Sequence, residues 1–250
     1  MPAYDSVDTL LADVDAVAIA LPPDVQARLA LRAAEARVHL LLDKPIALDV
    51  TAADRLVAAV EERGLASVVF FTNRFRREID EFLCRAAATG GWDGARVTMF
   101  TSILQPGGPY ADSAWRREKG GLWDIGPHAL SLVVPVLGPV RQVTALGGPH
   151  ATTHLLLQHA EGAVSTLALT LDAPPAATAI ESVFHGSAGF APVPAPVGSS
   201  VPAFRAAVSQ LVAGVRGGTE HPCDVRFGRD VVAVLAAAET ALWHRHVVQL

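Results

Sequence analysis

The chain has 250 residues, of which 51% are hydrophobic, and a formal net charge of −5. This length allows a buried core in one domain or two smaller ones, and the negative charge without a basic cluster argues against nucleic acid as the main partner. No segment reaches the roughly 18 consecutive apolar residues of a membrane-spanning helix, so we expect no membrane partner. The N-terminus lacks a basic region followed by an apolar one, and Cys84 and Cys223 lack metal-type spacing. We therefore expect a reduced, cytoplasmic protein.

The first 72 residues alternate between apolar runs, typical of buried strands, and helical segments. Strands are predicted at Asp15–Leu21, Val38–Leu42 and Ser67–Phe71, with helices at Val7–Asp13, Val25–Glu35 and Thr51–Arg63. This alternation predicts an α/β domain with a parallel sheet, whose ligands bind beyond the carboxyl ends of the strands. Pro22-Pro23 and Asp43-Lys44-Pro45 come at those strand ends, which makes this edge the first candidate for chemistry.

After residue 73 the pattern changes to an α+β arrangement, so we predict one domain over residues 1–72 and a second over 73–250. A helix (Arg76–Ala88) and a strand (Ala95–Leu104) precede a loop over Gln105–Lys119, which contains Tyr110, Trp115 and Arg116. Short turns then separate four predicted strands, which indicates an antiparallel sheet. These strands are Val140–Leu146, Thr152–His159, Ala163–Leu171 and Thr178–His185. An irregular segment, Phe190–Val201, and helices at Ala203–Arg216 and Arg229–Trp243 end the chain.

The second domain contains the run Gly120-Gly121-Leu122-Trp123-Asp124-Ile125-Gly126-Pro127-His128. If a helix begins near Leu122, Asp124 and His128 project from one face, one turn apart, and form a possible proton-transfer pair. The glycine pair would let the backbone approach a ligand or a neighbouring strand. The alternative is structural: an acidic residue favoured by the helix dipole and a histidine with satisfied hydrogen bonds. These residues alone leave both interpretations open.

Lysine is rare in this chain. Of the twenty basic residues only Lys44 and Lys119 are lysines. Because neighbours and burial move the pKa of a lysine more readily than that of an arginine, Lys44 suggests a requirement for an ammonium group. His150, His154 and His159 do not share one side of a strand and have no acidic or cysteine cluster, so we expect no metal site.

Together these motifs resemble the glucose–fructose oxidoreductase/inositol dehydrogenase (Gfo/Idh/MocA) family. The resemblance covers essentially the whole chain and depends on the order and spacing of four motifs. They are Val14–Pro23, Asp43-Lys44-Pro45 where the family usually has Glu-Lys-Pro, Asn73-Arg74-Phe75, and the Gly-Gly-x-x-Asp-x-Gly-x-His run.

The resemblance implies hydride transfer between NAD or NADP and a secondary alcohol of a sugar, cyclitol or similar polyol. It makes His128 the general base, Lys44 the group that binds the reacting hydroxyl, and Asp124 a residue that binds substrate or holds His128. It also implies a cofactor-binding set: Leu21, Pro22, Pro23, Gln26, Asp43, Lys44, Pro45, Asn73, Trp115 and Arg116. Removing a proton and a hydride from one carbinol unit needs a base at the oxygen and a cofactor face at the carbon. We therefore expect Lys44 and His128 to face a common pocket, and the Lys44–Pro45 peptide bond to be cis.

The sequence departs from the family in its first domain. The dinucleotide fingerprint Gly-x-Gly-x-x-Gly is absent, and Met1 aligns near the family's third strand, which leaves a partial Rossmann-like sheet that lacks its first strands. The strand at Asp15–Leu21 then has an unpaired apolar edge, and we expect negligible NAD(P)H affinity for these 250 residues. Gln26 replaces a frequent histidine, and Asp43 replaces the usual glutamate.

Three explanations for this departure stay open: an internal start codon, a truncated relative whose edge a partner covers, or a reduced mode of cofactor binding. The alternative function is a cofactor-free binding or assembly protein derived from the same family. In either case the resemblance implies a homo-oligomer formed through the antiparallel sheet. The missing glycine turn favours the alternative, whereas Lys44, Asp124 and His128 favour the enzyme.

Overall fold

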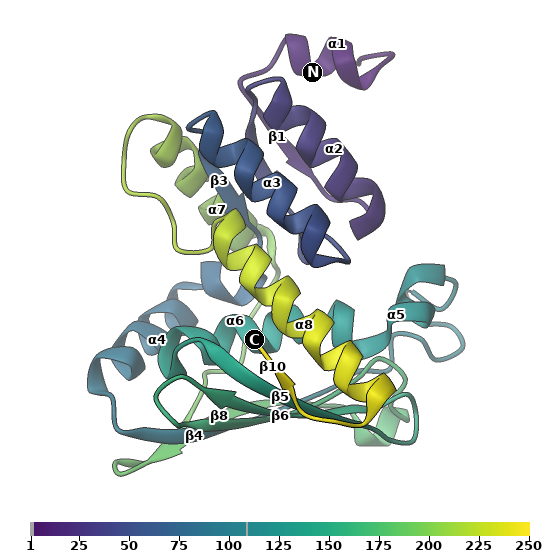
Figure 1. The fold of residues 1–250 in the computed structure, drawn as a ribbon, viewed down its shortest axis with the longest axis vertical. Coiled ribbons are helices and arrows are strands. Elements are labelled where there is room, and N and C mark those ends of the chain that lie inside the picture. The colour runs from purple at the N-terminus through teal and green to yellow at the C-terminus, as the bar shows by residue number, and fades with distance from the viewer. Residues whose placement is uncertain (1–2, 109) are drawn as a thin grey trace. The chain divides into compact units, whose positions relative to one another are not determined.

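The computed structural model describes residues 3–108 and 110–250, which fold into two compact units. The first unit contains the residues up to Phe75 together with Ser200–Val232. The second contains Arg76–Ser199 together with Ala233–Leu250. The sequence suggested a single boundary near residue 73, but the chain returns to the first unit before it ends. Figure 1 follows this path by colour.

The first unit is built on a three-stranded parallel sheet of order β1-β2-β3. Helices α2 and α3 connect its strands and contact each other, while α7 contacts β2 and β3. In chain order the elements are α1 (Val7–Ala12), β1 (Ala16–Ile19), α2 (Pro23–Glu35), β2 (His39–Leu42), α3 (Val50–Glu62), β3 (Ser67–Val69), the 3-10 helix η1 (Thr72–Phe75), α7 (Val201–Val215) and the start of α8 (Val225–His244).

Strand β1 lies at the end of this sheet and is less buried than its apolar sequence indicates. Ala16 and Ala18 are exposed and Ile19 is buried, whereas Leu40, Leu41 and Leu42 of β2 are all buried. The apolar run predicts a strand covered on both sides, and β2 meets that expectation because β1 and β3 flank it. Among the described residues, no strand pairs with the outer edge of β1.

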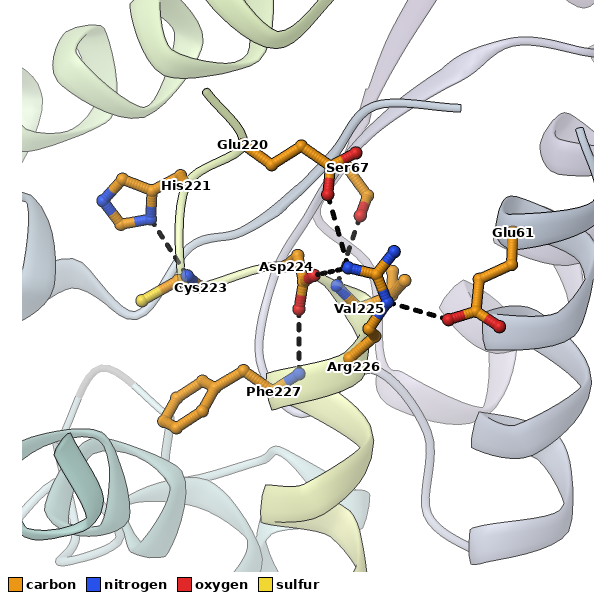
Figure 2. A network of polar contacts seen from close by, with 9 residues as sticks. All are labelled: Glu61, Ser67, Glu220, His221, Cys223, Asp224, Val225, Arg226 and Phe227. Carbon is orange, nitrogen blue, oxygen red and sulfur yellow. Dashed lines mark hydrogen bonds and ion pairs between the residues drawn. The ribbon is translucent and has the colours of Figure 1, made fainter. Parts of the chain in front are cut away.

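The returning segment is attached to the first unit by a polar network around the start of α8 (Figure 2). Arg226 Nε donates to Glu61 of α3 at 2.8 Å, and its Nη1 donates to Asp224 at 2.8 Å. Inside the unit, the backbone N–H of Val225 donates to Ser67 Oγ at 3.2 Å. The N–H of Val69 also donates to the carbonyl of Cys223 at 2.7 Å. Residues near 225 therefore complete the open side of β3.

The second unit is built on a seven-stranded sheet of order β10-β5-β6-β7-β4-β8-β9. Helices α5 and α6 pack on β7, α6 also packs on β4, and α4 packs on α6. In chain order the elements are α4 (Arg77–Thr89), β4 (Trp92–Phe100), α5 (Ala114–Asp124), α6 (Gly126–Leu137), β5 (Val140–Gly147), β6 (Thr153–His159), β7 (Val164–Thr170), the 3-10 helix η2 (Pro175–Ala177), β8 (Ala179–Gly186), β9 (Gly189–Pro192), the end of α8 and β10 (Val248–Gln249).

This sheet is mixed rather than purely antiparallel. Strands β5, β6 and β7 form the predicted antiparallel meander, but β4 lies between β7 and β8 and runs parallel to β7. Helices rather than a tight turn connect β4 to β5, so no hairpin fixes the direction of β4 against its neighbours. The segment expected to be irregular, Phe190–Val201, contains most of β9, which forms a hairpin with β8 across Ser187-Ala188.

One face of the second sheet is covered and the other is exposed. Along β6, Leu155 and Leu157 are buried at 3% and 0% exposure, while Leu156 between them is 48% exposed. Leu146 on the neighbouring strand β5 is 63% exposed. The period of two is that of a sheet with a single packed face. In the part of the chain that the structure describes, no helix is long and apolar enough to cross a membrane.

Candidate active site

In the first unit, three turns follow the three parallel strands and therefore lie at one edge of the sheet. The turn after β1 carries Leu21, Pro22 and Pro23, and Leu21 is 45% exposed. Pro22 is the N-cap residue of α2, and its carbonyl accepts from the N–H of Gln26 at 2.9 Å. Proline suits the start of a helix, where its missing N–H would have no partner within the helix. Asn73 lies in η1, after β3, and is half-buried.

The turn after β2 holds Asp43, Lys44 and Pro45. Asp43 and Lys44 are half-buried and Pro45 is buried. The backbone N–H of Lys44 donates to Asp43 Oδ1 at 2.8 Å. The Lys44–Pro45 peptide bond is cis, which confirms the prediction for that bond. Lys44 thus leaves the sheet edge from a tightly hydrogen-bonded turn.

Gln26 supports this turn from α2 and is fully buried. Its Nε2 donates to the carbonyl of Asp43 at 2.7 Å and to that of Pro45 at 3.2 Å. Its Oε1 accepts from the N–H of Asp43 at 3.0 Å. The sequence suggested Gln26 as a cofactor contact; the structure shows its carboxamide bonded to protein backbone, and the cofactor contact stays a prediction.

In the second unit, the candidate residues gather around α5 and the start of α6. Trp115 and Arg116 lie on α5, which begins at Ala114, whereas the sequence placed them in a loop. The helix-forming residues Ala114–Lys119 explain the difference, since only the glycine and proline before them resist helix formation. The guanidinium carbon of Arg116 lies 4.1 Å from the centre of the Tyr110 ring and 4.5 Å from that of Trp115.

Arg116 also holds the candidate carboxylate. Its Nε donates to Asp124 Oδ2 at 3.0 Å, and the side chain of Asp124 is 6% exposed. A carboxylate this buried requires a charged or hydrogen-bonding partner, and Arg116 supplies both. Sequence reasoning placed Tyr110 in the same loop but assigned it no role, because its position on the guanidinium depends on tertiary structure that no local pattern shows.

The glycine run is explained by packing within the second unit. Gly120 has φ +63°, and a Cβ at Gly121 would lie 3.0 Å from the backbone of Leu169 and Thr170 on β7. A Cβ at Gly126 would lie 2.9 Å from Leu235. Of the two partners that the sequence allowed for the glycine pair, the neighbouring strand is the one observed. The glycines let α5 and α6 lie close to the sheet.

His128 is half-buried in the first turn of α6, and its carbonyl accepts from Ser131 Oγ at 2.8 Å. Asp124 is the last residue of α5, so Asp124 and His128 flank the junction at Ile125 rather than lying within one helix. Backbone bonds from Ile125 to Gly121 and from Ala129 to Ile125 keep the turns nearly continuous. The spacing of four residues therefore still places both side chains near the junction.

Lys119 and Trp123 share one acidic partner. Lys119 Nζ and Trp123 Nε1 both donate to Glu239 Oε1, at 3.1 and 3.2 Å. Trp123 is fully buried, as expected for a packing residue. Sequence reasoning missed Glu239, because nothing in the C-terminal helical pattern links it to α5.

The histidines considered for metal binding have other surroundings. His159 is buried, with Nδ1 2.7 Å from the carbonyl of Gly138 and Nε2 2.9 Å from Ser165 Oγ. A carbonyl can only accept, so Nδ1 carries the proton and Nε2 accepts from the serine hydroxyl. Within residues 3–108 and 110–250, no cluster of three histidine, cysteine or acidic side chains could hold a metal ion.

A parallel α/β unit with its candidate lysine at the carboxyl edge, joined to a unit with a mixed sheet, is an α/β architecture with a partial Rossmann-like sheet. Two family models match the chain. The oxidoreductase family model with an NAD-binding Rossmann fold matches residues 1–71, and the GFO/IDH/MocA C-terminal domain matches residues 85–191. The chain belongs to the Gfo/Idh/MocA family of oxidoreductases. This result confirms the family resemblance on which the oxidoreductase prediction rests.

Individual relatives agree with this assignment. UDP-N-acetylglucosamine 3-dehydrogenase from Acidithiobacillus ferrooxidans is 43% identical over 67 residues, which are 27% of this chain and 21% of that protein. An uncharacterised oxidoreductase from Rhizobium meliloti is 32% identical over 186 residues, covering 63% of this chain and 55% of the relative. The chain thus spans about half the length of such a relative or less.

Among solved structures, the WlbA dehydrogenase from Bordetella pertussis, in complex with NADH and UDP-GlcNAcA, is similar with a TM-score of 0.82. Its sequence identity is 20%, and the match covers 99% of this chain and 83% of that one. At this identity the similarity shows the fold.

Proposed function

We propose that this chain carries the catalytic residues of a dehydrogenase that oxidises a secondary alcohol of a sugar, cyclitol or similar polyol. The observation that supports this most directly is the turn that fixes Lys44 at the carboxyl edge of a parallel sheet. That is the edge at which ligands of such sheets bind. Family membership and the sugar dehydrogenases among the relatives support the reaction class.

In this proposal the reacting hydroxyl needs a base and a cation, which are the roles that the family resemblance implies for His128 and Lys44. His128 accepts the hydroxyl proton, and the Lys44 ammonium stabilises the negative charge that develops on the oxygen. Asp124, held by Arg116 at 3.0 Å, orients a substrate hydroxyl or the imidazole. The rings of Tyr110 and Trp115, over which the guanidinium lies, keep Arg116 in place for that task.

NAD or NADP would accept the hydride when bound. The residues fit this group only in part: the Leu21–Pro23 turn, Asp43, Lys44 and Asn73 offer a surface at the sheet edge where the nicotinamide end would lie. The pyrophosphate normally requires a glycine turn at a helix N-terminus, and the first glycine of this chain is Gly64. We therefore expect these 250 residues to bind NAD(P)H no tighter than millimolar, and fluorescence titration with micromolar saturation would contradict this.

A turnover assay tests the catalytic assignment. The chain is mixed with millimolar NAD+ or NADP+ and a panel of UDP-sugars, free sugars and inositols, and the absorbance of reduced nicotinamide is followed. We expect Lys44→Met and His128→Asn each to reduce turnover by about 100-fold or more. The matched controls Lys119→Met and His246→Asn make the same chemical changes elsewhere and should retain turnover. The proposal is contradicted if Lys44→Met or His128→Asn keeps wild-type turnover. It is also contradicted if the wild-type chain turns over none of the substrates.

We further propose a homo-oligomer formed through the exposed face of the second sheet, in a cytoplasmic setting. Exposed Leu146 and Leu156 and a hollow of about 430 Å³ over the central strands support a protein partner on that face. Both cysteines are free, which fits a reducing compartment.

A further inference from the structure

The side chain of Gln26 lies behind the turn that carries Lys44. It projects from the fourth residue of α2 and is 0% exposed. It makes three hydrogen bonds to the backbone of Asp43 and Pro45. These bonds flank Lys44 on both sides, because the carbonyl acceptors belong to the residues before and after it. Gln26 therefore holds the two ends of the segment from which the lysine projects.

Two further bonds from backbone N–H groups hold this turn. The N–H of Asp43 also donates to Ile19 of β1 at 3.0 Å, and that of Lys44 donates to Asp43 Oδ1. Neither contact reaches the carbonyls of Asp43 and Pro45. If Gln26 were removed, both carbonyls would lose a donor in a buried setting, which is unfavourable unless the turn rearranges.

The chemistry of the carboxamide matches this environment. A glutamine offers two donor hydrogens and an acceptor oxygen, and here the donors meet two carbonyls while the oxygen meets an N–H. A carboxylate has no donor, and a neutral imidazole has one donor and one acceptor. Glutamate would thus place negative charge against two carbonyl oxygens, whereas histidine could keep part of the network.

We propose that Gln26 is a positioning residue for Lys44, acting through the Asp43–Pro45 turn and without touching the substrate. The inference rests on the proposed function of Lys44 for its catalytic meaning, but the positioning itself is a property of the first unit. Gln26 sets the direction in which the ammonium leaves the sheet edge. Its substitution is expected to alter the surroundings of Lys44 without altering those of Lys119.

The composition of the chain provides the test, because Lys44 and Lys119 are its only lysines. Protein labelled with carbon-13 and nitrogen-15 in lysine gives two side-chain signals, assigned with Lys119→Arg. We expect Gln26→Leu and Gln26→Glu to shift the Lys44 signal and leave the Lys119 signal in place. Exchange of the Asp43 amide hydrogen should be about tenfold faster in Gln26→Leu, which removes the side-chain acceptor of that N–H. Gln158→Leu, the same change at an exposed position of β6, should alter neither reading.

Gln26→His provides the partial rescue. It should shift the Lys44 signal in the same direction by a smaller amount, and it remains informative if Gln26→Leu does not fold. An unchanged Lys44 signal in any folded Gln26 variant, Gln26→Glu included, overturns the proposal.

The two proposals fail separately. If Lys44→Met keeps wild-type turnover while the Gln26 variants still shift the Lys44 signal, the catalytic role of Lys44 is wrong and the positioning stands. If Lys44→Met abolishes turnover and Gln26→Leu changes neither the signal nor turnover, the positioning is wrong. Where both hold, Gln26→Leu should lower kcat with little change in KM for the alcohol, because the substrate contacts remain.

Discussion

Arg116 combines a charge partner with two aromatic contacts. Its guanidinium is bonded to Asp124 and lies near the rings of Tyr110 and Trp115, and its side chain is 20% exposed. The aromatic contacts restrict the rotamers of a long side chain, so less conformational entropy is lost when the ion pair forms. The nearly buried carboxylate of Asp124 depends on this partner for its stability.

Removing the guanidinium should therefore cost more than a surface ion pair. We expect Arg116→Met to lower the free energy of unfolding by about 2–4 kcal/mol, because it removes a cation that bonds to the nearly buried carboxylate of Asp124. Adding Asp124→Asn to that variant should recover much of the loss. Urea unfolding of the two single variants and the double variant measures the coupling, and purely additive effects would contradict this account.

His159 gives the fold a dependence on pH. Burial lowers the pKa of His159 below its ordinary value of 6.5, and this effect outweighs that of the bond to the Gly138 carbonyl, which raises the pKa. Below pH 6.5 the unfolded chain therefore binds a proton that the folded chain does not. Stability is fully present above that pH and is lost as the pH falls toward the lowered pKa.

We expect His159→Gln to flatten this loss between pH 6.5 and the lowered pKa of His159. A single histidine contributes a slope of up to about 1.4 kcal/mol per pH unit. The measurement is the urea midpoint of wild type and variant across that range, with His154→Gln as the exposed control. Parallel curves for wild type and His159→Gln would show that other groups cause the acid sensitivity.

At the scale of elements, the strand and helix types of the first 75 residues could be predicted because each follows a local pattern. The apolar runs at β1 and β2 and the proline at the start of α2 are visible without tertiary information. The parallel pairing of β4 with β7 was not predictable from turns, because the two strands are separated by 63 residues and two helices. Trp115 on a helix and Glu239 beside Lys119 likewise depend on long-range packing.

In the candidate site, too, local features could be predicted from the sequence and long-range contacts could not. The turns carrying Pro22 and Lys44 could be placed at one edge from sequence, since parallel strands present their carboxyl ends together. The three bonds of Gln26 could not, because nothing in its spacing shows which way the carboxamide points. Similarly, the glycine run could be recognised, but only the structure identifies β7 as the surface that Gly121 approaches.

The close packing of Gly121 against β7 predicts that a larger side chain at this position is destabilising. In Gly121→Ala the new Cβ would lie 3.0 Å from β7 backbone atoms, which cannot move like a flexible side chain. We expect a loss of about 1–3 kcal/mol in stability from this overpacking. The matched control is Gly147→Ala on β5, where the new Cβ would meet no neighbouring heavy atom within 4 Å. Thermal unfolding checks both, and equal midpoints would contradict the packing argument.

At the scale of the whole molecule, the exposed face of the second sheet is the surface that the proposed oligomer would cover. Leu146 and Leu156 lie on adjacent antiparallel strands, so their side chains share that face. We expect Leu146→Glu and Leu156→Glu to convert the oligomer to monomer, because each would bury a carboxylate in an apolar contact.

Size-exclusion chromatography with light scattering measures this change at matched concentrations. Val212→Glu, at a 40% exposed apolar position on α7, controls for the effect of an added charge. A wild-type chain that elutes as a monomer, or glutamate variants that stay oligomeric, would contradict the interface.

The return of the chain to the first unit at Ser200 also has a consequence for biosynthesis. The segment supplies Phe204, whose ring packs edge-on to Phe70 at 5.4 Å, and Cys223, whose carbonyl bonds to β3. A ribosome releases residues 76–199 before these contacts can form, so β3 lacks its contact with Cys223 while most of the second unit has already emerged. The residues of β1 to β3 are thus translated well before the segment that completes their packing, and they need protection from aggregation until Ser200–Val232 has emerged.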